Sequence, residues 1–431
     1  MKKILTVILC LALALVFVLG CDSDDTSEAH GGDVELSGTL TVWSWDPMFN
    51  IYAMDRAAEI YQQINPDFEI NNIEVSWGEL HDNILVAGTT GDFDGLPDIF
   101  LMDNSMIQRN VLSFPELFYD ITDSGIDFSE FVNSQLNFSM VDGRNFGVPF
   151  DNGATVMALR SDILGQAGFT VDDFTSITWD TFIEQGMQVL AETGMPMIST
   201  ADTGSFIAFM LQSAGANLFN ADGTPNIAGN TALHEVIETY VRLVESGVLL
   251  ETAGWEEYTN SFVNDEVVGT LSGNWILGTV QLNETGYGYW AVTNMPRLDI
   301  PGGTNYSNFG GSSWLVNPHS ENKELAIDFL TNTFAGSVEL FDTILPTISA
   351  VSSWMPALAS SAYTEPHPFF GGQQIFADIL NFSANIPAVN IGLYHGVATD
   401  SIGIAMSHIL EGADIVAELQ AAQESTEFAM S

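Results

Sequence analysis

The segment that most constrains the fold runs from residue 142 to residue 160. It opens with an Asp-Gly turn signal and continues as an extended stretch through Pro149, which keeps the residue before it out of the helical region. Gly147 and Gly153 permit the close approach of another backbone segment. An apolar strand follows the carboxylate of Asp151. The pattern therefore predicts a strand that leaves one folding unit and enters another, with polar groups at the junction.

The residues before this segment alternate between strand and helix patterns. Residues 39–43, 68–75 and 97–102 are rich in β-forming residues, whereas 48–64 and 79–87 have apolar residues at a helical period. This alternation predicts a parallel α/β sheet with right-handed crossovers. Ligands of such sheets bind beyond the carboxyl ends of the strands, so that edge is the predicted functional edge.

Two further extended segments, 290–296 and 345–351, predict that the chain passes between two units three times in all. Three crossings between α/β units are typical of a two-lobed fold that closes around a ligand by a hinge. The fold class is therefore α/β, with the ligand cleft between the lobes. The predicted first lobe comprises residues 37–145 and 297–346, and the predicted second lobe comprises 150–292 and 352–431.

The first 21 residues have the pattern of an export signal. Lys2 and Lys3 precede an apolar run over 4–19, which is short for a membrane span. The run ends in a sequence that resembles a bacterial lipobox, so we expect Cys21 to be lipidated; the alternative is an ordinary secretory signal. Residues 22–36 are acidic and small, and predict a flexible tether. We therefore expect a cell-envelope lipoprotein, periplasmic or on the outer face of the cytoplasmic membrane, attached to the membrane by its lipid anchor only.

The charge balance excludes one class of partner. The chain has 9 basic and 56 acidic residues, for a net charge of −47. Nucleic acid binding needs a basic surface that displaces counterions, so nucleic acid is excluded, and anionic ligands are disfavoured. The acidity predicts a strongly solvated surface, for which we hypothesise a saline habitat, while attraction of cationic ligands stays open as an alternative.

Several stretches together resemble a known family. In chain order they are L-T-V-W-S-W, P-D-I-F-L-M-D, G-R-N-F-G-V-P-F-D, L-S-G-N-W and I-P-A-V-N-I-G-L-Y. Their order and spacing are similar to those of family 1 extracellular solute-binding proteins, the sugar-binding receptors of bacterial ABC importers, which include maltose-binding protein. The resemblance implies a monomer without a cofactor that binds a small sugar and delivers it to the transmembrane subunits of an ABC permease.

Sugars present hydroxyl groups to carboxylates and amides, and C–H faces to aromatic rings. Four candidates follow the first and third strands, namely Trp45, Asp46, Asp103 and Asn104. The alternative for these polar residues is helix capping. Asp151 is a fifth candidate, for which the alternative is a hinge hydrogen bond.

Later segments add candidates for the same cleft, namely Trp275, Gly311, Ser312, Trp354 and Tyr394. Tyr394 depends mainly on the resemblance, and the alternative for Trp275 is a core position. Four other tryptophans lie within strand or helix patterns and are expected in the core, namely Trp43, Trp179, Trp290 and Trp314.

The sequence gives little support for catalysis. It has no G-x-S-x-G, H-E-x-x-H or C-x-x-C motif, its seven histidines are scattered, and its Gly-rich stretches lack a following lysine. We therefore expect neither an enzyme nor a metal site. The predicted function is binding of a mono- or oligosaccharide for import. A polyamine or other cationic ligand, and a receptor that feeds a signalling partner, remain as alternatives.

Overall fold

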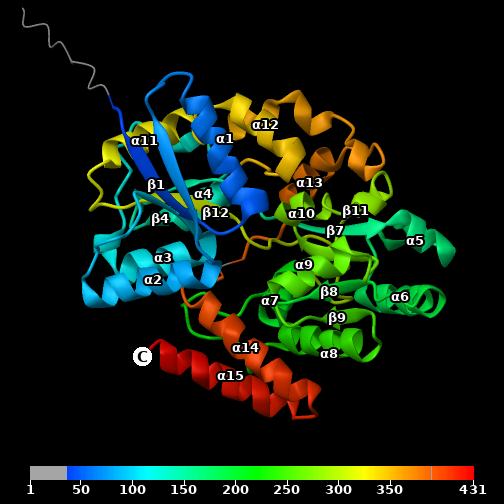
Figure 1. The fold of residues 1–431 in the computed structure, drawn as a ribbon. Coiled ribbons are helices and arrows are strands. Elements are labelled where there is room, and N and C mark those ends of the chain that lie inside the picture. The colour runs from blue at the N-terminus through cyan, green and yellow to red at the C-terminus, as the bar shows by residue number, and fades with distance from the viewer. Residues whose placement is uncertain (1–35, 390) are drawn as a thin grey trace, which may run out of the picture. The chain divides into compact units, whose positions relative to one another are not determined.

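The computed structural model describes residues 36–389 and 391–431. The predicted signal, the predicted lipidation site Cys21 and nearly all of the predicted tether lie outside these residues. The described part forms one compact unit with two larger sheets, two two-stranded sheets and their helices (Figure 1). No helix in it combines the length and the apolar character that crossing a membrane requires.

The first lobe is built on a five-stranded sheet in the order β2-β1-β3-β12-β6. Its strands are β1 (Thr39–Ser44), β2 (Glu69–Glu74), β3 (Ile99–Asp103), β6 (Gly147–Pro149) and β12 (Ser312–Val316). β1 pairs in parallel with β2 and β3, as the sequence predicts, whereas β12 runs antiparallel to β3 and β6. β12 alone runs against the other four strands, and β6 and β12 are the strands that adjoin the crossing segments.

Helices cover both faces of this sheet. One face packs against η1 (Pro47–Ile51), α1 (Tyr52–Tyr61), α11 (Lys323–Asn332) and α12 (Val338–Ile348). The other packs against α2 (Trp77–Thr90) and α3 (Asn104–Ser113) (Figure 1). Because both faces are covered, the central strand β3 is apolar at Ile99, Phe100, Leu101 and Met102, all fully buried. α4 (Asn133–Ser139) and the pair β4 (Met140–Val141) and β5 (Arg144–Asn145) complete this region.

The second lobe contains the sheet β10-β7-β11 and the pair β8-β9. These strands are β7 (Thr155–Arg160), β8 (Ile198–Thr200), β9 (Leu249–Glu251), β10 (Gly269–Gly273) and β11 (Trp290–Thr293). Around them lie α5 (Ser161–Gln166), α6 (Trp179–Thr193), α7 (Thr203–Ser213), α8 (Thr231–Glu245), α9 (Trp255–Val263), α10 (Leu277–Val280) and α13 (Ile375–Ala384). The chain ends in α14 (His395–Leu410) and α15 (Ile415–Ala429). Figure 1 shows this last pair along the side of the molecule where α3 and α7 lie, and α14 packs against both.

The crossing segments differ from the predicted boundaries at two places. Residues 298–309 do not belong to the first lobe, because Leu298 is buried in the second lobe's core and Phe309 packs against it. The chain therefore passes back from the second lobe to the first at Gly310–Ser312. The third crossing is also shorter than predicted, because α12 continues to Ile348 with Pro346 inside it. Burial of the helix's apolar face outweighs the single hydrogen bond that proline removes.

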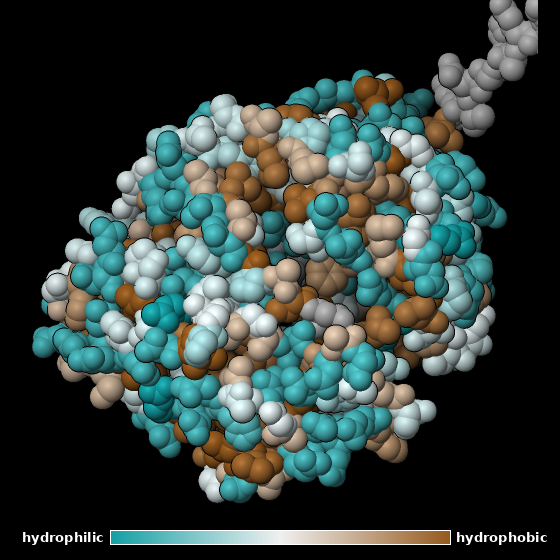
Figure 2. All heavy atoms as spheres, turned by 180° about the vertical axis from the view of Figure 1, so that it is seen from behind, coloured by the Kyte–Doolittle hydropathy of each residue, from teal (hydrophilic) through white to brown (hydrophobic). Residues whose placement is uncertain are grey.

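The C-terminal pattern over 399–423 predicts one helix, whereas the structure has two. Gly412 has a φ of +98° between α14 and α15, a conformation that favours glycine and ends the first helix. Among the tryptophans expected in the core, Trp179, Trp290 and Trp314 are fully buried, while Trp43 is only half-buried. The face in Figure 2 is mostly hydrophilic, with hydrophobic residues in separate patches.

Candidate ligand-binding site

Asp151 lies where the three crossing segments meet. Its Oδ1 accepts hydrogen bonds from the backbone nitrogen and the hydroxyl of Ser312, at 2.8 and 2.7 Å. Its backbone oxygen accepts a hydrogen bond from the hydroxyl of Ser353 at 2.8 Å, and its backbone forms a bridge with Ser352. The carboxylate is 2% exposed. Asp151 therefore has the hinge role that the sequence left as the alternative to ligand contact.

Beside this junction, a cavity of about 320 Å³ lies between the lobes. The first lobe contributes Asn104, Ser105, Gln108, Ser134, Gln135, Asn137 and Phe138. The crossing segments and second lobe contribute Asn152, Gln212, Asn308, Ser383, Ile386, Pro387, Ala388, Val389, Ile391, Gly392 and Leu393. None of these described lining residues carries a formal charge. A cavity with seven side-chain amides and no ion fits a neutral, hydroxyl-rich ligand.

Hydrogen bonds orient the amides of the first-lobe wall. The hydroxyl of Ser313 donates to Asn104 Oδ1 at 2.7 Å, and Asn104 Nδ2 donates to Gln135 Oε1 at 2.8 Å. Both amides are buried. Gln135 Nε2 makes no hydrogen bond within the described part of the chain, so this wall presents a donor to the cavity. A side-chain donor held by a relay of this kind is pre-oriented for a ligand acceptor.

Two amide oxygens on the wall formed by the crossing segments have no partner among the described residues. They are Oδ1 of Asn152 and Oδ1 of Asn308, and both atoms are buried. Gln212 supports this wall, since its Oε1 accepts hydrogen bonds from the nitrogen of Asn308 and the hydroxyl of Ser307, both at 3.1 Å. The cavity therefore offers acceptors from the crossing segments and a donor from the first lobe.

Of the predicted site residues, only Asn104 lines this cavity. Gly311 lies directly behind its wall, because a Cβ there would come within 2.8 Å of Gln135 Oε1 and 3.0 Å of Asn104 Nδ2. Ser312 does not line the cavity but donates two hydrogen bonds to Asp151. Asp46 and Asp103 take the capping alternative, since Asp46 accepts from the nitrogen of Met48 and Asp103 from that of Ser105, each at 2.8 Å.

Burial raises the pKa of three carboxylic acids at this edge of the first lobe. It raises the pKa of Asp46 and Asp103, whose side chains still keep some contact with solvent. It raises the pKa of Asp151 to about 6, and nearby Asp103 adds to this effect. These carboxylic acids near the uncharged cavity therefore keep their protons to a higher pH than exposed carboxylic acids do.

The four predicted aromatic residues lie outside this cavity's lining. Trp354 is 6% exposed and packs in the first lobe's core, with Nε1 donating to Glu130 at 3.1 Å, so the structure places it in the core and not in the lining of this cavity. Trp275 is half-buried, and its Nε1 donates to the backbone oxygen of Phe309 at 2.8 Å. Trp45 is half-buried against the first lobe's cores. The aromatic residue that lines the cavity is Phe138, which the sequence did not indicate.

Tyr394 contacts a side chain of the other lobe. The guanidinium carbon of Arg109, on α3, lies 4.9 Å from the centre of its ring. Arg109 forms no ion pair among the described residues, although acidic residues are abundant. One face of Tyr394 is therefore occupied by Arg109, and the pair joins the lobes beside the cavity residues Gln108 and Leu393.

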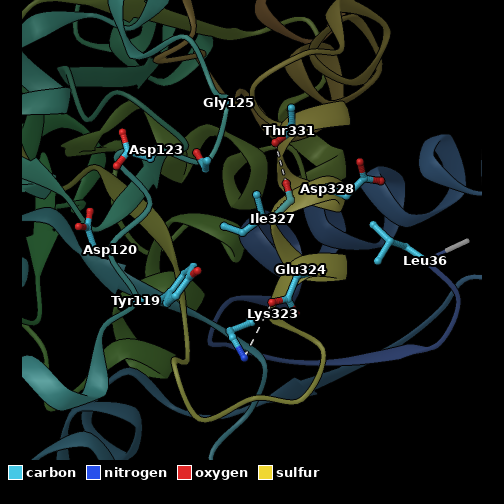
Figure 3. A pocket seen from close by; sticks show the side chains of 11 residues that line it. Leu36, Tyr119, Asp120, Asp123, Gly125, Lys323, Glu324, Ile327, Asp328 and Thr331 are labelled. Carbon is cyan, nitrogen blue, oxygen red and sulfur yellow. Dashed lines mark hydrogen bonds and ion pairs between the residues drawn. The ribbon is translucent and has the colours of Figure 1, made fainter. Parts of the chain in front are cut away.

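A second hollow, of about 400 Å³, lies entirely within the first lobe (Figure 3). Asp120 and Asp123 lie on one side of it, and Glu324 and Asp328 on α11 lie on the other. Lys323 is 4.0 Å from Glu324. Because no residue of the second lobe lines this hollow, a ligand there would not touch both lobes, and it is not the candidate site.

Comparison with known proteins identifies the family. Residues 56–362 match the family described as bacterial extracellular solute-binding protein. The chain belongs to this family. One relative of this solute-binding protein, 36% identical over 90% of the chain and 92% of its own length, is the lactose-binding protein of Rhizobium radiobacter. Another, 26% identical over 86% of the chain and 84% of its own length, is the arabinooligosaccharide-binding protein of Halalkalibacterium halodurans.

Solved structures share the fold of this solute-binding protein. The GacH receptor of Streptomyces glaucescens superposes with a TM-score of 0.76 at 16% identity, over 92% of the chain and 98% of its own. Maltose-bound T. maritima MalE3 superposes with a TM-score of 0.76 at 19% identity, over 91% of the chain and 99% of its own. These similarities establish the two-lobed solute-binding architecture that the sequence predicts.

Proposed function

We propose that this solute-binding protein holds a neutral oligosaccharide, of about disaccharide size, between its lobes and delivers it to an ABC permease in the membrane. The observation that carries the proposal is the uncharged, amide-lined cavity to which both lobes contribute. A ligand that touches both lobes stabilises the closed form, because closure depends on differential contact. The relatives named for lactose and arabinooligosaccharides support a carbohydrate ligand.

A cationic solute is the second candidate, favoured by the acidic surroundings. Asp103 and Asp151 lie near the cavity without lining it, so a polyamine would leave its charges unpaired by the described lining residues. Binding of a cation should weaken strongly as salt rises, whereas binding of a neutral sugar should hardly change. Titration at low and at molar salt therefore separates the two candidates.

The remaining parts of the proposal concern the cell envelope. The protein would act as an exported monomer, without catalysis, anchored through lipid on Cys21. The lipobox-like sequence supports the anchor. If Cys21→Ala leaves the protein in the membrane fraction, the anchor is wrong.

The ligand is tested with the protein that begins at residue 22. Its melting temperature is measured against a panel of lactose, galactobiose, arabinobiose, maltose, spermidine and glutamate. A ligand present at 100 times its dissociation constant stabilises the folded state by about 2.7 kcal/mol, which is a measurable shift. A shift with a sugar supports the proposal. A shift with spermidine alone would replace the sugar by a cation and leave the fold assignment intact.

A further inference from the structure

Asn308 is held in one orientation that leaves its acceptor unused. Its Nδ2 donates to the backbone oxygen of Gly310 at 2.8 Å, and its backbone nitrogen donates to Gln212 Oε1 at 3.1 Å. Because Nδ2 is engaged, Oδ1 is the free end of the amide. That atom is buried and has no partner among the described residues, and Asn308 is one of the residues that line the cavity.

Asn152 presents a second unused acceptor on a neighbouring segment. Its side chain is 7% exposed and its backbone nitrogen donates to the oxygen of Val351 at 3.0 Å, while its Oδ1 has no described partner. The two segments are adjacent, since the nitrogen of Phe309 donates to the oxygen of Gly153 at 2.7 Å. Buried carbonyl oxygens without a hydrogen bond are costly, so each of these oxygens is placed to accept from a ligand.

We propose that Asn152 and Asn308 are specificity-determining residues, which together accept hydrogen bonds from two hydroxyl groups of the bound sugar. This proposal rests on the proposed function. A hydroxyl fits the cavity better than an ammonium group, because a hydroxyl can also accept a hydrogen bond from a donor such as Gln135 Nε2, whereas an ammonium group has no acceptor. The pair therefore selects a neutral sugar with donors at two positions and rejects analogues in which either hydroxyl is removed or methylated.

The proposal is tested by calorimetric titration of the protein that begins at residue 22 with lactose, galactobiose, arabinobiose, maltose and spermidine. Asn152→Leu and Asn308→Leu keep the approximate shape and remove the acceptor. Each should weaken binding of the sugar about tenfold to hundredfold, the range expected when a ligand hydroxyl loses a buried partner. Asn332→Leu, on the exposed face of α11, is the matched control. If Asn308→Leu does not fold, Asn308→Ser replaces it.

Monodeoxy and mono-O-methyl derivatives of the sugar that binds then distinguish recognition from a structural effect. For each variant, one derivative lacks the hydroxyl that would donate to the replaced asparagine, and this derivative should bind the wild-type protein weakly. The same derivative should lose little further affinity in that variant, because the hydrogen bond is already absent. If both variants keep the fold and bind the sugar within twofold of wild type, the inference is wrong and the proposed function stands. If the wild-type protein binds only spermidine or nothing in the panel, the proposed function fails first, and this inference fails with it.

Discussion

Asp151 and Ser312, 161 positions apart in the sequence, are joined by two hydrogen bonds from one carboxylate oxygen, at 2.8 Å to the backbone nitrogen and 2.7 Å to the hydroxyl. The same residue accepts from Ser353 on the third segment. One buried aspartate thus connects all three chain passages between the lobes.

The first prediction concerns pH. Burial raises the pKa of Asp151 to about 6 from an ordinary 3.8, so the folded protein keeps this proton to a higher pH than the unfolded chain does. Stability contributed by this group therefore falls as pH rises from about 4 to about 6. Asp151→Asn cannot ionise and keeps an acceptor for Ser312. The free energy of unfolding in urea of Asp151→Asn minus that of the wild type should increase by about 1–3 kcal/mol from pH 4 to pH 7.5.

The control for this experiment is Asp67→Asn, on the surface of the first lobe. It removes one charge from the same acidic chain without touching a crossing segment. Parallel pH profiles for the two variants would assign the effect to net charge and not to the hinge.

The second prediction concerns the contact between the first two crossing segments. A Cβ on Gly153 would lie 2.6 Å from the carbonyl carbon of Gly310 and from the oxygen of Phe309, and neither backbone atom can easily move aside. We expect Gly153→Ala to lower the free energy of unfolding by about 1–3 kcal/mol. Gly165→Ala on α5 meets no atom within 4 Å and should be neutral or slightly stabilising. Equal urea midpoints for the two variants would contradict the prediction.

The third prediction concerns the contact between Arg109 and Tyr394, which joins the lobes without a ligand. Both residues are half-buried. A cation–π pair that solvent still reaches contributes about 0.5–1 kcal/mol, so Arg109→Gln should shift the ligand-free protein toward a wider separation of the lobes by about two- to fivefold in population. Spin labels on Asp67→Cys and Asp172→Cys report that distance. Arg56→Gln removes a similar contact with Tyr52 inside the first lobe and should leave the distance distribution unchanged.

The fourth prediction concerns salt. With 56 acidic and 9 basic residues, self-repulsion destabilises the compact state, and added salt screens it. The urea midpoint should therefore rise from low to molar potassium chloride. A midpoint that stays constant would remove the physical basis for the saline-habitat hypothesis. Affinity for a neutral sugar should stay within about twofold over the same range, because no described lining residue is charged.

Local patterns predicted the parallel strands β1, β2 and β3 because apolar periodicity and strand ends are properties of short segments. They also predicted close backbone approach at Gly153, which the structure confirms. They could not predict that Gln135 from α4 and Gln212 from α7 meet at one cavity, since isolated amides on helices have no distinguishing pattern. Asn152 did have one signal, because it lies beside Gly153 in a crossing segment, whereas Phe309 separates Asn308 from the nearest glycine.

Trp354 shows a different limit of prediction from local sequence. Its position after a predicted crossing made it a candidate, but the backbone there pairs with Phe131 of the first lobe, and the ring packs in that lobe's core. A tryptophan at a hinge and a tryptophan in a cleft have the same local sequence context, and only the path of the chain separates them.

The uncharged cavity within so acidic a molecule separates two properties that evolution can then change independently. Acidic residues can accumulate or disappear on the outer surface as a lineage moves between fresh and salty water, without altering the amides that line the cavity. Relatives with very different isoelectric points would therefore keep the same ligand specificity. The surface composition would follow the salinity of the habitat, and the amides of the cavity would follow the ligand.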